Sequence, residues 1–446
     1  MSVFRVRLLP SAIAPAPGET LLDFAPGSAA ATVQANATFF SNVAPPPPAA
    51  DLLLMGIAAY CADRVTPRRE TVDAWTRDIG LRLPVHSPDT WPSEEAERTL
   101  GFLTGDRWDI RAHPRSGTRT DAPHSPVERE SPQADAVCLF SGGLDSLCGV
   151  IDLLEEDSER RLLLLSHYEG GQTPNAQARL FQRLRARYGR RVRRQPLFLR
   201  PAPHHLAQDQ PLPPERETTS RSRSLLFLTS ALALASSIGP AVPVYLPENG
   251  YIGVNVPLTP ARSGSFSTRT THPYFLSLLQ QTARAVGIDN PLVNPYRLMT
   301  KGEMLESSRN PELLRDLSLL SVSCSHPEVA RYARRPQGNC GYCFPCLIRR
   351  SSMARAGWDS ADDYSWDALS DPALLDTDSD RSADLRAVVI GTRPGRPDRD
   401  VLRNGPLPAG ERRAFLDVWR RGSTEVRSWL TTGATGALAE QLEKTA

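Results

Sequence analysis

The sequence predicts an α/β protein built around a doubly wound parallel sheet. From residue 134 onward, short runs typical of strands alternate with longer runs typical of helices, which is the pattern of repeated βαβ units. The strands are nearly all apolar, as expected when helices cover both faces of a parallel sheet. A glycine-rich turn follows the first strand, at the edge where open α/β sheets bind their ligands.

The elements of this sheet follow one another in a regular order. A strand leads through the glycine-rich turn into a helix, a second strand and helix follow, and another helix and strand come after a polar loop. The predicted strands are residues 134–141, 160–168 and 241–250, and the predicted helices are residues 146–156, 175–189 and 223–239.

The apolar pattern divides the chain into four segments. The first carries an alternating strand, an apolar helix and what we interpret as two short strands around a Gly-Asp turn at residues 99–113, so we predict a small α+β accessory domain there. The second lacks any apolar period and is typical of a linker. The segments are the accessory domain 1–114, the linker 115–133, the sheet domain 134–357 and a mostly helical C-terminal extension 358–446.

Composition argues against several function classes. The net charge of +2 is nearly balanced, so the overall field gives no reason to expect a nucleic-acid partner. Apolar runs are too short to span a bilayer, and the N-terminus lacks the pattern of a signal peptide. We therefore expect a cytoplasmic protein without a membrane partner.

The glycine-rich turn, LFSGGLDS at residues 139–146, is the first candidate site. Such a turn exposes backbone N–H groups at the positive end of a helix, which favours phosphate. Ser141 and Ser146 add hydroxyl donors, and Asp145 can hold Mg²⁺ against a pyrophosphate. The pattern GxxxxGK[ST] is absent, so this is not a P-loop NTPase. The alternative is an ordinary strand-to-helix turn, which favours the same residue types.

A cysteine cluster is the second candidate site. Cys340, Cys343 and Cys346 follow a CxxCxxC spacing, and Cys324 lies upstream. In a reduced compartment this clustering indicates a metal rather than disulfides. Four thiolates complete a tetrahedral zinc site of the structural kind. An iron–sulfur cluster is the competing interpretation, and four unliganded thiols are a third.

The motif LFSGGLDS resembles the signature of the PP-loop ATP pyrophosphatases, which cleave ATP to AMP and pyrophosphate while adenylating a substrate oxygen. The resemblance implies a PP-loop (HUP-like) sheet, ATP and Mg²⁺ as ligands, and a loop that cradles the departing pyrophosphate. It also implies that the second strand meets the adenine near Ser166 and His167. The loop residues so implied are Leu139, Phe140, Ser141, Gly142, Gly143, Leu144, Asp145 and Ser146, of which Asp145 and Ser146 are expected to be catalytic.

Together with the cysteine cluster and the LIRR after it, the motif resembles the 7-cyano-7-deazaguanine synthases, the QueC family, which end in a four-cysteine zinc site. This resemblance covers residues 135–357. The long gap between Cys324 and Cys340 and the additional N-terminal residues are more similar to the QueC-like proteins of bacterial anti-phage operons, such as the Qat system. The resemblance implies a small deazaguanine-like substrate, and partner proteins of a defence operon that bind through the N-terminal domain.

Lysine is almost absent from the chain, in which Lys301 and Lys444 are the only two among 52 basic residues. Because arginine is used wherever it suffices, an internal lysine marks a place that needs a compact ammonium. Thr300 and Glu303 around Lys301 form a capping box. We predict that Lys301 reaches the ATP phosphates and stabilises charge as pyrophosphate leaves.

Five further residues are candidate ligand contacts. Glu248 and Asn249 follow a predicted strand, and a carboxylate and an amide there can read a guanine-like edge. Arg269 and His272 occupy a Ser/Thr-rich loop suited to order over a bound adenylate. Arg223 begins a long helix, where the helix dipole disfavours a cation, so we predict a phosphate contact. The alternative for Arg223 and for the loop residues is a solvated side chain.

These residues together predict an ATP-dependent C–N ligase. A carboxylate of the 7-carboxy-7-deazaguanine type attacks ATP, and an amine, either ammonia or a protein amine, then displaces AMP. Two other functions stay open. One is a PP-loop enzyme that modifies tRNA, which would need a basic surface and often a catalytic cysteine. The other is a non-catalytic nucleotide-binding subunit of a defence complex.

Overall fold

The computed structural model describes most of the chain. Of the predicted linker 115–133, only the two end residues are among the described ones. The described residues are 1–8, 14–29, 31–115, 133–171, 173–204, 212–219, 221–259, 269–332, 335, 338–376 and 379–444.

Ten strands form one sheet in the order β10-β9-β6-β7-β8-β3-β2-β1-β4-β5. Every neighbouring pair is parallel except β3 and β8. The predicted α/β class with a largely parallel sheet is therefore confirmed. The strands are β1 (Ser2–Leu8), β2 (Glu19–Phe24), β3 (Val33–Ala35), β4 (Asp78–Val85), β5 (Arg107–Pro114), β6 (Ala136–Leu139), β7 (Leu162–Tyr168), β8 (Val192–Pro201), β9 (Val244–Tyr245) and β10 (Leu292–Val293).

The two halves of the sheet share one strand order. In β6 to β10, the first strand is central, the second and third follow on one side, and the fourth and fifth lie on the other. The strands β1 to β5 repeat this arrangement, and the third strands of the two halves, β3 and β8, pair with each other. The N-terminal strands are thus parallel to one another, which differs from the α+β arrangement that we predicted for residues 1–114.

Residues 99–104 also differ from the prediction, because they belong to a helix rather than a strand. Helix α3 (Ser93–Thr104) has Glu94 and Glu95 in its first turn and ends at Gly105, whose φ is 79°. Acidic residues near the helix N-terminus and a glycine in the left-handed region after its end are both strong helix signals. Only the second half of the segment, from Arg107, is a strand.

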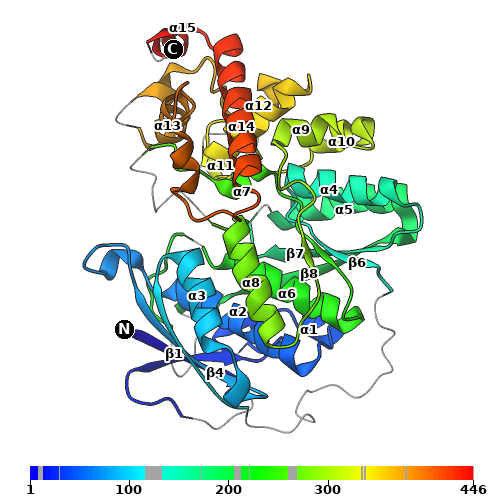
Figure 1. Ribbon diagram of the computed structural model, residues 1–446, viewed down its shortest axis with the longest axis vertical. Helices are drawn as coiled ribbons and strands as arrows, with labels where there is room; N and C mark the ends of the chain where they lie inside the picture. The colour runs from blue at the N-terminus through cyan, green and yellow to red at the C-terminus, as the bar shows by residue number, and fades with distance from the viewer. Residues whose placement is uncertain are drawn as a thin grey trace.

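The helices cover both faces of the sheet and build an additional layer at the C-terminal end (Figure 1). They are α1 (Ala37–Asn42), α2 (Pro47–Val65), α3 (Ser93–Thr104), α4 (Leu144–Glu156), α5 (Thr173–Tyr188), α6 (Arg223–Ile238), α7 (Gly250–Val254), α8 (Pro273–Ala285), α9 (Lys301–Glu306), α10 (Pro311–Ser318), α11 (Val329–Tyr332), α12 (Phe344–Arg355), α13 (Ala383–Gly391), α14 (Arg412–Gly433) and α15 (Gly436–Glu443).

Helices α2 and α6 pack against each other and join the two halves of the sheet. Their backbones approach so closely that a Cβ placed on Gly56 of α2 would lie 2.1 Å from the Thr229 hydroxyl oxygen of α6. Of the 19 residues of α2, 15 are buried. One apolar cluster runs from Phe4 in β1 to Leu225 in α6, so the N-terminal segment and the sheet domain share a core.

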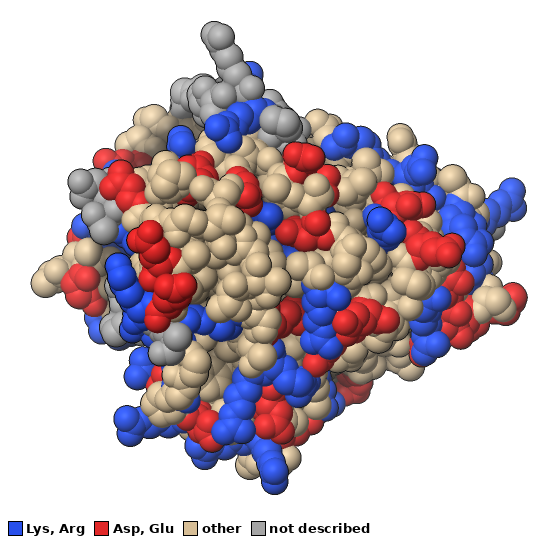
Figure 2. All heavy atoms as spheres, turned by 90° about the horizontal axis from the view of Figure 1, so that it is seen from above, with Lys and Arg blue, Asp and Glu red and all other residues tan. Residues whose placement is uncertain are grey.

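The C-terminal extension forms a second layer around α14, which packs on α12 and α7. Its apolar cluster contains Trp419 and Leu430 of α14 and also Cys340, Cys343 and Cys346. Over the face shown in Figure 2, acidic and basic side chains are interspersed. Within the described part of the chain, no helix has the length and apolar character that crossing a bilayer requires.

Candidate functional site

The glycine-rich loop lies between the carboxyl end of β6 and the start of α4. The amide of Gly143 donates to the Ser141 hydroxyl at 3.2 Å, and the hydroxyls of Ser141 and Ser146 lie 3.2 Å apart. The first turn of a helix leaves its N–H groups without intrahelical partners. The loop therefore combines hydroxyls and helix N-terminal amides, the groups that bind phosphate oxygens. Leu139, Phe140 and Leu144, by contrast, place their side chains against the core.

Gly142 holds the loop in a conformation that other residues rarely adopt. Its φ is +86°, and a Cβ added there would meet the Gln177 side chain at 3.0 Å. Gln177, on α5, donates to the carbonyl of Ser141 at 3.1 Å and to that of His167 at 3.2 Å, and it accepts from Arg194. Gln177 therefore ties the loop to the end of β7. The sequence carries no local signal for this role.

Asp145 is the centre of the polar contacts at this edge of the sheet. Its carboxylate lies 2.7 Å from the Lys301 ammonium, and both residues are more than nine-tenths buried. Asn249 donates its side-chain amide to Asp145 at 2.7 Å. Burial on its own would raise the pKa of Asp145, but Lys301 and hydrogen bonds from Glu248 and Asn249 bring the pKa below its usual value.

Glu248 faces Asp145, and its pKa shifts in the opposite direction. Burial and the neighbouring Asp145 carboxylate raise the pKa of Glu248 well above its usual value. Two neighbouring carboxyl groups do not both ionise readily. The two directions favour a neutral Glu248 beside an ionised Asp145. A divalent cation, which takes oxygen ligands, would find two carboxyl groups here once Glu248 is ionised.

Asn249 orients Asp145, and its predicted substrate contact stays a prediction. The side chain is fully buried. Its carbonyl oxygen caps α7 by accepting from the Ile252 amide, and its NH₂ group donates to Asp145 and to Glu248. All of its polar groups are therefore engaged within the protein.

A segment just before the cysteine cluster lies over the glycine-rich loop. The Val322 amide donates to the carbonyl of Gly142 at 3.0 Å, and the Ser323 hydroxyl accepts from the Leu144 amide at 3.1 Å. Asn339, which precedes Cys340, holds this segment by accepting from the Ser323 amide at 2.9 Å. Sequence reasoning missed Ser323 and Asn339, although each directly precedes a cysteine of the cluster.

The residues at the end of the second strand turn their side chains into the protein. Ser166 and His167 are fully buried. The His167 ring accepts from Arg223 at 3.2 Å through Nδ1 and donates to the carbonyl of Leu199 through Nε2. Burial and the Arg223 cation lower the pKa of His167 to about 3, so the ring is neutral. Arg223 itself is exposed, and a second cation, Arg194, donates to the Ser166 hydroxyl at 3.1 Å.

Arg269 and His272 lie apart from this centre. Arg269 donates to the carbonyl of Phe102 at 2.7 Å and stacks over its ring. His272 is fully buried and caps α8 by accepting from the Tyr274 amide. Among the described residues, neither side chain contacts Asp145 or Lys301. The two residues join α8 to α3, and their substrate role stays a prediction.

The four cysteines form a compact cluster that can hold a metal ion. The sulfur atoms of Cys324, Cys340, Cys343 and Cys346 all lie within 4.8 Å of one another. The Cys324–Cys343 and Cys340–Cys346 sulfur distances are 3.8 and 3.9 Å. Zinc–sulfur bonds of about 2.3 Å in a regular tetrahedron would separate the sulfurs by about 3.8 Å. The cluster thus fits a tetrahedral ion such as zinc.

The three remaining cysteines do not offer a reactive thiolate. Cys61, Cys138 and Cys148 are fully buried. Burial raises the pKa of each of these thiols, and the nearby Asp152 and Asp145 carboxylates raise that of Cys148 further. A thiol with a raised pKa is a poor nucleophile at neutral pH.

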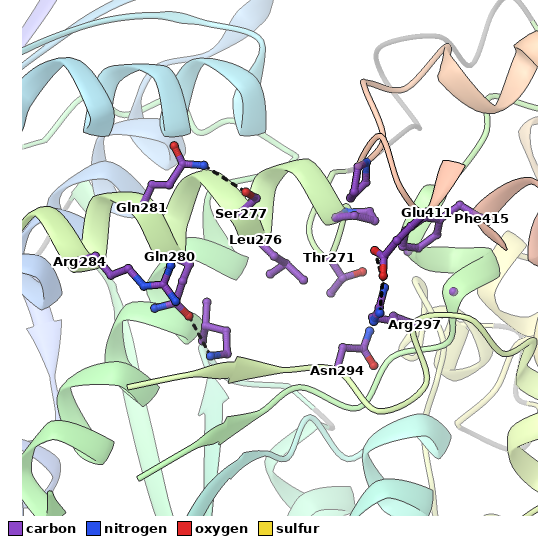
Figure 3. Close-up of a pocket in the computed structure, with 15 residues that line it drawn as sticks. Thr271, Leu276, Ser277, Gln280, Gln281, Arg284, Asn294, Arg297, Glu411 and Phe415 are labelled. Atoms are coloured by element: carbon purple, nitrogen blue, oxygen red, sulfur yellow. Dashed lines mark hydrogen bonds and ion pairs between the residues drawn. The ribbon is translucent and has the colours of Figure 1, made fainter. Parts of the chain in front are cut away.

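A cavity of about 370 Å³ lies between α7, α8 and the start of α14. Figure 3 shows Arg297 and Glu411 paired in its wall, with 2.6 Å between the guanidinium nitrogen and the carboxylate oxygen. Asn294 in its wall donates to the carbonyl of Glu248 at 2.9 Å. Asp145 and Lys301 do not line this cavity. It therefore adjoins the polar centre without opening onto those two side chains.

Comparison with known proteins adds no family to this picture, since no family model and no curated protein matches the chain.

Proposed function

We propose that the protein is an ATP-dependent ligase that adenylates a carboxylate of the 7-carboxy-7-deazaguanine type. The observation that carries the proposal is the Lys301–Asp145 pair, 2.7 Å apart, at the end of a loop rich in glycine and serine. A binding site for the triphosphate of ATP needs donors for the phosphates, a carboxylate for Mg²⁺ and a cation for the developing charge. All three are present here within one cluster.

In the reaction we propose, a carboxylate oxygen of the substrate attacks the α-phosphorus of ATP. The bond from this phosphorus to the bridging oxygen breaks, and pyrophosphate leaves with the electron pair. The amides and hydroxyls of the loop would bind the pyrophosphate, and Lys301 would exchange its contact with Asp145 for one with the phosphates, which stabilises the developing charge. Asp145, joined by Glu248 after loss of its proton, would hold Mg²⁺.

The second step is attack by an amine nitrogen on the carbonyl carbon of the adenylate. AMP leaves, the nitrogen loses a proton, and an amide forms. With ammonia as the amine, the amide oxygen attacks a second ATP and releases pyrophosphate, and loss of AMP together with both nitrogen protons gives the nitrile, as in the QueC family. With a protein amine, the product is a conjugate, which suits the resemblance to anti-phage proteins and a partner bound through residues 1–114.

The tRNA-modifying alternative has less support. It often requires a catalytic cysteine, whereas burial raises the pKa of Cys138 and Cys148, the two thiols that flank the loop in the chain. The face seen in Figure 2 carries mixed charge rather than a broad basic surface. A basic surface would be expected for an RNA partner.

Exchange of labelled pyrophosphate into ATP tests the proposal, with 7-carboxy-7-deazaguanine as substrate and 7-deazaguanine, which lacks the carboxylate, as control. Exchange should require the carboxylate. Asp145→Asn and Lys301→Met should each reduce it by at least about 100-fold, the usual effect of removing one group that stabilises transition-state charge. Lys444→Met, the matched lysine control, should leave exchange and metal content unchanged. Absence of exchange in the wild type, alone or with partner proteins, would contradict the proposal.

A further inference from the structure

The C-terminal extension contacts the helix that carries Lys301. Helix α14 lies against α12 and α7, and α9 lies beside α12 (Figure 1). The side chains of α14 that face α9 are polar, in contrast to those that face the apolar cluster around Trp419. Glu425 and Arg421, one turn apart, make these contacts.

Glu425 accepts hydrogen bonds from the first turn of α9. Its carboxylate is 2.7 Å from the Thr300 hydroxyl and 3.2 Å from the Gly302 amide. Thr300 and Gly302 are the two neighbours of Lys301 in the chain. Glu425 therefore holds the residues on both sides of the one whose ammonium contacts Asp145.

Two further donors come from α12. The Ser352 hydroxyl donates to Glu425 at 2.9 Å, and the Arg355 guanidinium lies 3.2 Å from it. The side chain of Glu425 is only 4% exposed. All four of these partners are donors, so the site is built for a carboxylate. An amide would turn its own N–H groups toward some of them.

Helices α9 and α14 are closely packed at this point, without space for an additional side-chain atom. A Cβ added to Gly302 would lie 2.5 Å from a Glu425 oxygen and 2.6 Å from Arg355. Arg421, one turn earlier on α14, bonds Glu303 at 2.6 Å and the carbonyl of Leu298 at 2.8 Å. The contacts thus hold α9 from the residues before its N-terminus to its first turn.

We propose that Glu425 is a positioning residue for Lys301, so that the C-terminal extension completes the polar centre at the glycine-rich loop. Glu425 acts through the Thr300 hydroxyl and the Gly302 amide and does not itself reach the reacting atoms. That Lys301 contacts ATP rests on the proposed function, whereas the dependence of Lys301 on Glu425 does not.

The lysine content of the chain allows a direct measurement, because Lys301 and Lys444 are the only lysines. Lys301 is 6% exposed, and Lys444 is exposed. Acylation by an N-hydroxysuccinimide ester, followed residue by residue with mass spectrometry, gives the labelling rate of Lys301 relative to Lys444. The full-length protein is used without nucleotide, so this measurement requires no activity.

In Glu425→Gln, the Lys301 rate relative to Lys444 should rise by about tenfold or more, since a hydrogen bond to a charged group typically contributes at least that factor. Asp400→Asn is the matched control. Asp400 is also 4% exposed and pairs with Arg396 and Arg403, all within the C-terminal extension. It should leave the Lys301 rate unchanged. An equal rate in wild type and Glu425→Gln would overturn the proposal, as would an equal rise in Asp400→Asn.

If Glu425→Gln does not fold, the labelling experiment uses Arg421→Gln instead. Arg421 is 45% exposed, so its loss should be tolerated. It should raise the Lys301 rate by a smaller factor, and no rise would overturn the proposal.

Pyrophosphate exchange then distinguishes a positioning role of Glu425 from an effect on protein stability alone. Glu425→Gln should lower kcat with little change in KM for ATP, and it should have no further effect in the Lys301→Met background. Additive losses would indicate a merely structural role. If the wild type shows no exchange but the labelling rate responds to Glu425, the proposed function fails and the positioning role stands.

Discussion

Single side chains at the polar centre serve two neighbours at once. Asn249 caps α7 with its carbonyl oxygen and holds Asp145 with its NH₂ group. Gln177 binds the carbonyls of Ser141 and His167. Because each such residue fixes the position of another, the centre is ordered before any ligand arrives. Preorganised polar groups of this kind lower the reorganisation needed when charge develops.

Buried neutral histidines make the stability of the fold depend on pH. Burial and the Arg269 cation lower the pKa of His272 to about 3. Between this pKa and the unfolded value near 6.5, only the unfolded chain binds the proton, so stability falls as pH drops from about 6.5 toward 3. At pH 5.5 the loss is about 1.4 kcal/mol for one such group. His167 acts in the same direction.

We predict that His272→Asn reduces this pH dependence while it keeps the helix cap. Asparagine accepts from a helix N-terminal amide as well as any residue and does not titrate. Urea unfolding at pH 7.5 and pH 5.5 measures the effect. The difference in unfolding free energy between the two pH values should shrink by about 1.4 kcal/mol. An unchanged difference would show that His272 titrates normally in the folded protein.

At the scale of elements, the sequence predicted those whose signal is local. The strands at 134–141 and 160–168 correspond to β6 and β7, and the capping box at Thr300 is present. The strand predicted at 241–250 is only Val244–Tyr245. Within the rest of that segment, Asn249 caps the short helix α7. Residues 99–104 form a helix whose N-terminal signals lie outside the segment that suggested strands.

Elements and residues whose contacts are with backbone groups far away in the sequence could not be predicted. The β3–β8 pair joins residues more than 160 positions apart, and no local pattern marks it. The same holds in the candidate site. Asp145, Lys301 and the cysteines stand out by residue type and spacing, and the structure brings the first two together. Gln177, Ser323 and Glu425 contact backbone groups of other segments, a role that most polar residues can fill.

The segment just before the cysteine cluster contacts the glycine-rich loop. We therefore predict that metal binding at the cysteines and ligand binding at the loop are coupled. Cys343→Ser should release the metal and lower the melting temperature, since such sites contribute directly to folding. Ser323→Ala should keep the metal but weaken ATP binding by up to about tenfold, because it removes one hydrogen bond from the start of α4. Elemental analysis and calorimetric titration with ATP measure the two effects. Metal loss in Ser323→Ala, or unchanged ATP affinity, would contradict this coupling.

At the scale of the whole molecule, two halves with the same strand order meet at their third strands. Only the second half carries a glycine-rich loop after its first strand. The first half instead covers the second, since α2 packs on α6 and the Thr99 and Thr282 hydroxyls, 2.9 Å apart, link α3 to α8. The first half therefore contributes to the core that both halves share.

We predict that residues 133–446 do not fold alone. Without residues 1–115, the edge of β8 would lose its partner, and an open strand edge promotes aggregation. The apolar face of α6 that α2 covers would also reach water, at a cost comparable to the net stability of about 5–15 kcal/mol of a typical domain. Solubility and size-exclusion chromatography of the fragment should show aggregates, and co-expression with residues 1–115 should restore a soluble complex of both pieces. A monomeric fragment 133–446 with cooperative unfolding would show instead that the second half has a sufficient core of its own.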